Sequence, residues 1–94
     1  MTEPPDLSSY VALLDQFVAS DVTAEQFDLE YLRMFLGDHR MFGDPWYPVL
    51  NDLFYACEDY VIQPELRTEP GDLDEAQLLD AARTARARLA ALGV

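Results

Sequence analysis

Residues 44–61 read DPWYPVLNDLFYACEDYV, and this stretch decides how the rest of the chain is interpreted. Plotted at about 100° per residue, its apolar side chains fall on one side of a helix. They are Trp46, Val49, Leu50, Leu53, Cys57, Tyr60 and Val61, with Phe54 at the edge. The opposite side carries Tyr55 at its centre with three carboxylates around it, those of Asp52, Glu58 and Asp59. Asn51 lies on the same side. The pattern predicts a helix with one buried side and an acidic outer face.

The end of this helix is unusually acidic. Glu58 and Asp59 fall in its last turn, where the helix dipole disfavours negative charge by about 0.3–1 kcal/mol each. A helix with a purely structural role is better ended by arginine or lysine. We therefore interpret the outer face as a surface for a basic partner, with an ordinary solvated helix face as the open alternative.

Length and composition predict one domain. The chain has 94 residues, half of them apolar, which is enough for a modest core. Its single cysteine, Cys57, lies on the apolar side of its helix, so we expect a buried, unreactive thiol. The first residues, MTEPPDLSS, lack the apolar segment of a signal peptide, and no apolar run approaches a membrane span of about 20 residues. We expect a cytoplasmic protein without membrane contact, in which residues 1–7 form a flexible tail.

The charge balance points to the kind of partner. Eighteen acids oppose six arginines, there is no lysine, and the net charge is −12. Residues 1–80 hold all eighteen acids and three of the arginines, a charge of −15. Direct binding to nucleic acid is disfavoured because phosphates would be repelled. An acidic field favours fast capture of basic proteins, although it also simply keeps a small protein in solution.

The same periodicity predicts three further helices. A first helix, capped by Ser8 or Ser9, would bury an apolar side. Its members are Tyr10, Val11, Leu13, Leu14, Phe17 and Val18. Thr23 and Gln26 match a capping box that opens a second helix, which should stop at Gly37.

The helix starts near residues 44 and 72 have equally clear signals. Asp44 followed by Pro45 is typical of an N-cap and first helical position. Asp72 or Asp74 would cap a last helix that ends at Gly93. Its buried stripe is Leu78, Ala82, Ala85, Leu89 and Leu92. Four helices with short links predict an all-α fold, an antiparallel four-helix bundle.

The second helix is apolar over more than half its circumference. Leu29, Leu32 and Leu36 extend the stripe of Phe27, Tyr31, Met34 and Phe35. We predict that these leucines are buried between neighbouring elements. The alternative is an exposed apolar patch available to a partner.

Motifs for catalysis or cofactor binding are missing from the sequence. One histidine and one cysteine are too few for a zinc site, and the acids at 72 and 74 do not begin an EF-hand loop. No phosphate-binding loop, nucleophile elbow or carrier-protein DSL tripeptide is present. We expect His39 to be an ordinary surface residue, and we expect no enzyme activity, metal or cofactor.

The order of motifs resembles the colicin D-type immunity proteins, the bacterial self-protective immunity family. The similarity runs through QFVASDVTAEQF (16–27), DLFYACEDY (52–60), PELR (64–67) and GDLDEAQLL (71–79). The ordered combination covers residues 8–92, although each piece alone is unspecific. The resemblance implies an antiparallel four-helix bundle that occludes the active site of a cognate anticodon-loop tRNase, with acids standing where tRNA phosphates would bind.

By position, the resemblance implies Asp52, Glu58 and Asp59 as partner-binding acids around an aromatic anchor, Tyr55. Glu65 and Glu69 in the following loop are further candidates, and Arg67 between them is expected to be paired internally. Our hypothesis is a monomeric inhibitor of a basic nuclease toxin. The alternatives are a self-associating helical adaptor or regulator, a DNA mimic that binds another basic protein, and a carboxylate-rich cation binder.

Overall fold

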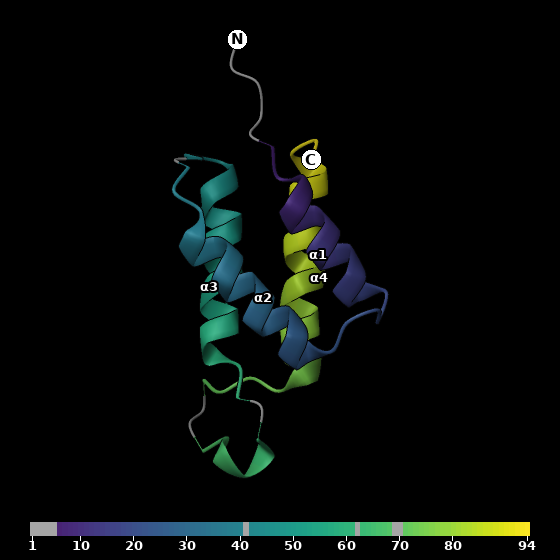
Figure 1. Ribbon diagram of the computed structural model, residues 1–94, viewed down its shortest axis with the longest axis vertical. Helices are drawn as coiled ribbons and strands as arrows, with labels where there is room; N and C mark the ends of the chain where they lie inside the picture. Colours follow the sequence, from purple (N-terminus) through teal and green to yellow (C-terminus); the bar gives the residue numbers. More distant parts are fainter. Residues whose placement is uncertain (1–5, 41, 62, 69–70) are drawn as a thin grey trace.

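Four α-helices form an antiparallel bundle in the part of the chain that the structure describes (Figure 1). The computed structural model describes residues 6–40, 42–61, 63–68 and 71–94. The helices are α1 (Ser8–Val18), α2 (Ala24–Gly37), α3 (Trp46–Asp59) and α4 (Glu75–Ala91), with a short 3-10 helix η1 (Pro64–Leu66) between the last two. The predicted all-α four-helix fold is confirmed.

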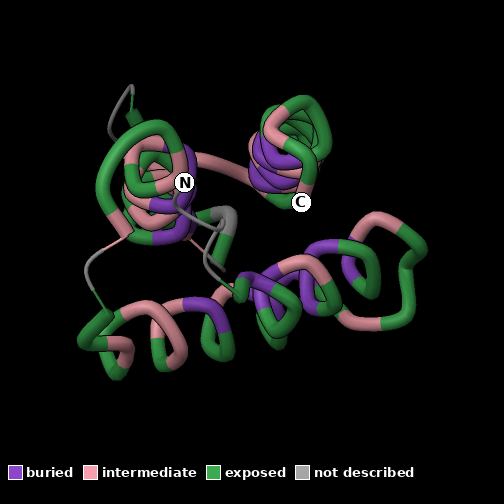
Figure 2. Tube along the Cα trace, turned by 90° about the horizontal axis from the view of Figure 1, so that it is seen from above, coloured by how far each residue is buried: buried purple, intermediate pink, exposed green. Residues whose placement is uncertain are grey.

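The helices form two layers. Viewed from above, α3 and α4 stand side by side, and α1 and α2 lie across them in a second layer (Figure 2). Both α4 and α2 pack mainly against α3 and α1, and they contact each other much less. The buried stretches of all four helices face the space between the layers, so the outer sides of α2 and α3 stay open to solvent.

The predicted apolar stripes meet in one core. Buried side chains come from every helix: Tyr10, Leu13, Leu14 and Phe17 from α1, Phe27 and Tyr31 from α2, Val49, Leu50, Leu53 and Cys57 from α3, and Leu78, Ala82, Ala85 and Leu89 from α4. Burial of a large apolar side chain stabilises a fold by about 1.5–3 kcal/mol. The Tyr31 hydroxyl donates to the Leu50 carbonyl oxygen at 2.7 Å, so this buried polar group is satisfied.

Two of the four predicted helix starts are confirmed. Thr23 with Gln26, and Asp74 with Gln77, both form complete capping boxes. At α3 the prediction was wrong: Pro45, not Asp44, occupies the N-cap, and the turn is closed by a backbone hydrogen bond from Tyr47 N to Gly43 O at 2.8 Å.

The start of α1 also differs from the prediction. Leu7 is the N-cap residue and no side chain of α1 caps the helix; the Asp6 carboxylate accepts a hydrogen bond from Ser8 N at 3.0 Å. The prediction that residues 1–7 form a flexible tail was wrong for Leu7. Its side chain is buried in the core, where removal of apolar surface from water stabilises the fold. Residues 1–5 lie outside the described residues.

The exposed leucines of α2 are the main departure from the predicted packing. Leu29 is 57 % exposed and Leu36 is 62 % exposed, so the prediction that both are buried was wrong. The reason is geometric: α2 contacts the other helices through the side that carries Phe27 and Tyr31, and in the part of the chain that the structure describes nothing covers the opposite side.

Candidate protein-binding surface

The predicted site residues of α3 all lie on its outer face. Asp52, Tyr55, Glu58 and Asp59 are exposed, and the Tyr55 side chain is 58 % exposed. The helical period that buries Leu50, Leu53 and Cys57 turns these four positions away from the core. The structure therefore leaves a tyrosine and three acids accessible on one helix.

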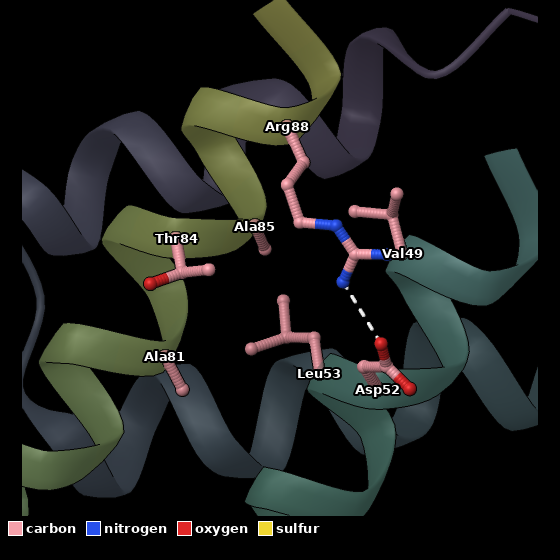
Figure 3. Close-up of a pocket in the computed structure, with 7 residues that line it drawn as sticks. All are labelled: Val49, Asp52, Leu53, Ala81, Thr84, Ala85 and Arg88. Atoms are coloured by element: carbon pink, nitrogen blue, oxygen red, sulfur yellow. Dashed lines mark hydrogen bonds and ion pairs between the residues drawn. The ribbon is translucent and has the colours of Figure 1, made fainter. Parts of the chain in front are cut away.

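Asp52 differs from the other acids because it has a cationic partner. Arg88 Nη1 on α4 lies 2.8 Å from Asp52 Oδ2. Figure 3 shows Arg88 reaching from α4 toward α3 across a groove of about 250 Å³, beside Val49, Leu53 and Ala85. The carboxylate of Asp52 is thus directed toward α4.

Several aromatic rings of α2 and α3 pack against one another next to Tyr55. The Tyr55 ring meets the Phe54 ring edge-on, with centroids 5.6 Å apart. Phe54 stacks on Phe35 of α2 at 4.9 Å, and Phe35 also meets Tyr47 at 6.2 Å. The exposed tyrosine therefore sits on a packed aromatic base that joins α3 to α2.

Asp28 of α2 is an acid that the sequence analysis did not single out. Its Oδ1 atom is buried and, among the described residues, has no hydrogen-bond partner. Burial raises the pKa of Asp28 from 3.8 to about 6; the Glu58 carboxylate adds to the rise, and an interaction with the Cys57 thiol opposes it. Burial likewise raises the pKa of the Cys57 thiol, which agrees with the expected buried, unreactive cysteine. Asp28 of α2 therefore lies close to Cys57 and Glu58 in the last turns of α3.

The connection after α3 holds the remaining predicted residues. Glu65 is exposed on η1, and Glu69 lies outside the described residues. Arg67 donates from Nε to the Val61 carbonyl oxygen at 2.7 Å and pairs with Glu75 at 3.0 Å. The predicted internal pairing of Arg67 is confirmed.

Most arginines are engaged by acids of this chain. Within the described residues, five of the six arginines take part in ion pairs: Arg40–Asp38, Arg67–Glu75, Arg83–Asp80, Arg86–Asp15 and Arg88–Asp52. Glu58 and Asp59 are not among the acids in these pairs. The acidic end of α3 consequently keeps its negative charge toward solvent.

The described residues form neither a metal site nor a membrane-spanning helix. Among them, no group of three or more His, Cys, Asp or Glu side chains could hold a metal ion. His39 is exposed, as expected. In the described ranges, no helix combines the length and apolarity needed to cross a membrane.

The fold and its exposed face define a small, acidic, all-α protein. Over residues 6–89, the chain matches the family described as bacterial self-protective colicin-like immunity, and it belongs to that family. The match includes α1, α2, α3 and most of α4. No curated protein and no solved structure matches the chain. Membership of a colicin-like immunity family implies that the chain binds a cognate colicin toxin.

Proposed function

We propose that the chain neutralises a colicin D-like tRNase toxin in the cytoplasm by covering the toxin's basic active site with an acidic surface. The observation that carries the proposal is the acidic outer end of α3, where Tyr55, Glu58 and Asp59 are exposed and the arginine ion pairs of the described residues involve other acids. Asp52, Glu65 and Glu69 extend this surface to either side. The protein itself performs no catalysis and needs no cofactor.

The electrostatics favour this partner. A cleft that binds RNA must be positively charged to hold phosphates, so an acidic protein surface is complementary to it. Carboxylates of Glu58 and Asp59 stand in for substrate phosphates, and the body of the bundle blocks access to the cleft. Association is expected to be fast and to slow with added salt.

Tyr55 is the proposed anchor at the centre of the acids. Large aromatic side chains dominate the binding energy of many interfaces because they bury area at low entropic cost. The Tyr55 ring contacts the Phe54 ring edge-on, and Phe54 in turn stacks on Phe35, so part of its apolar environment exists before binding. Its truncation to alanine should cost about 2 kcal/mol or more of binding free energy.

The test is a calorimetric titration of the protein into the inactive nuclease domain of a toxin encoded beside its gene, at low and high salt. We expect one-to-one binding at nanomolar or tighter affinity that weakens with salt. Reversal of Asp52, Glu58 and Asp59 together to lysine should weaken binding by several kcal/mol.

A matched variant controls for net charge. Replacing Asp15, Asp21 and Asp80 by lysine changes the charge equally on the α1–α4 side and also breaks two surface ion pairs. The control should lose far less affinity than the α3 variant. If both variants bind alike, net charge and not the α3 face governs binding, and the site assignment fails.

A further inference from the structure

The outer side of α2 carries a ridge of leucines that the acidic site does not use. Leu29 and Leu36 are more than half exposed, and Leu32 between them is half-buried. The spacing i, i+3, i+7 puts all three on one side of the helix, over a length of about 10 Å at 1.5 Å per residue. We call Leu29, Leu32 and Leu36 the α2 ridge.

The ridge adjoins the aromatic base of the acidic site. Phe35 lies between the buried side of α2 and the ridge, and its ring stacks on Phe54 of α3. Phe54 in turn supports Tyr55. An apolar surface therefore runs from the α2 ridge across Phe35 and Phe54 to the exposed ring of Tyr55.

We infer that the α2 ridge is the apolar half of the partner-binding surface, and that it binds an apolar patch set within a basic protein surface. The inference rests on the proposed function and specifies the partner's chemistry: the toxin domain should present apolar side chains next to its basic cleft. Exposed apolar patches on a small protein commonly mark such interaction sites.

The charges around the ridge select a basic partner over a second copy of this chain. Glu25 shares the ridge side of α2 one turn before Leu29, and the exposed Glu58 of α3 is near enough to Asp28 of α2 to contribute to the raised pKa of Asp28. A second copy would bring the same acids into apposition, at a net charge of −12 on each molecule. Like charges across an interface are repelled, whereas a basic surface is attracted at the same positions.

The ridge and the acids should act on different steps of binding. Charges steer the encounter, so they set the association rate and its salt dependence. Desolvated apolar contacts form after the encounter, so they set the dissociation rate. Loss of the ridge is thus expected to raise the dissociation rate and to leave the salt dependence of association unchanged.

The test compares Leu29→Ala with Leu36→Ala, and the double variant, in binding to the inactive nuclease domain used above. Alanine removes apolar area, keeps the charge and favours the helix. Each single variant should weaken binding about tenfold, and the double variant more, through faster dissociation. Leu79→Ala is the matched control, because Leu79 is a half-buried leucine of α4 that lies outside both the ridge and the acidic surface; the affinity of this variant should change less than twofold.

Each outcome has one meaning. If wild-type protein binds and the double variant binds equally well, the ridge inference is overturned and the proposed function stands. If Leu79→Ala weakens binding as much as the ridge variants do, the assignment to α2 is overturned. If wild-type protein dimerises in sedimentation experiments and the double variant does not, the occupant is a second copy. If wild-type protein does not bind the toxin domain, the proposed function fails and the inference fails with it.

Discussion

Arg88 of α4 donates from Nη1 to Oδ2 of Asp52 on α3 at 2.8 Å, and this ion pair closes one side of the groove between the two helices (Figure 3). The two side chains are 42 % and 65 % exposed, so solvent screens the pair and its contribution to stability is about 0–1 kcal/mol. The pair matters more for binding, because it neutralises one of the acids on the proposed toxin-binding face.

Arg88→Gln should therefore leave the fold nearly as stable as before and speed association with a basic partner. The free energy of unfolding, from urea denaturation, should fall by no more than about 1 kcal/mol. The association rate, from stopped-flow mixing with the inactive nuclease domain, should rise because Asp52 is released and one positive charge is lost. A slower association would contradict the role given to Asp52.

Asp28→Asn should stabilise the protein at neutral pH. The pKa of Asp28 is raised to about 6 in the folded protein, so between pH 4 and 6 the folded state binds more protons than the unfolded state. Stability contributed by this group is therefore present at low pH and is lost as pH rises through about 6. Above that pH the substitution should gain about 1 kcal/mol, a value reduced for partial solvent access.

The measurement for Asp28 is urea denaturation at pH 5 and pH 7.5. The gain should be larger at pH 7.5. Glu30→Gln, which removes an exposed acid from the same helix, controls for net charge and should change stability by less than about 0.5 kcal/mol at both values. A loss of stability for Asp28→Asn at both pH values would mean that the carboxyl group makes a needed hydrogen bond.

Thr23→Ala should destabilise the fold by about 1 kcal/mol, because the Thr23 side chain accepts from Gln26 N at 3.1 Å in the capping box of α2. Ser9→Ala is the paired substitution at α1. Since no side chain of α1 caps that helix, Ser9→Ala should be neutral or slightly stabilising. The measurement is the midpoint of thermal unfolding of both variants. It should fall for Thr23→Ala, whose side chain caps α2, and should not fall for Ser9→Ala.

Ala82→Leu should cost about 1–3 kcal/mol, since Ala82 is fully buried where α4 meets the core and three added carbons must displace neighbours. Ala87→Leu adds the same atoms at an exposed position of the same helix. Its effect on the midpoint of thermal unfolding should be small. Equal effects at the two positions would show that the core tolerates the added volume.

Much of the fold was predictable because helices are local. The apolar periods of all four helices, the capping boxes at Thr23 and Asp74, and the burial of Cys57 depend on residues a few positions apart. The candidate face of α3 follows from the same period, since positions opposite Leu50 and Leu53 must point outward. The predicted N-caps at Ser8 or Ser9 and at Asp44 were wrong, because several neighbouring residues can occupy the N-cap position and Leu7 and Pro45 occupy it in the structure.

The sequence by itself determined the helices, their apolar sides, the excess of acids and the family to which the chain belongs. Only the tertiary structure decided which apolar side chains find a neighbour. Leu29 and Leu36 stay exposed because no described helix packs on their side of α2, and Asp52 meets Arg88 because α4 returns beside α3, thirty-six positions further along the chain. Periodicity records the direction in which a side chain points; what it meets there depends on contacts between distant segments.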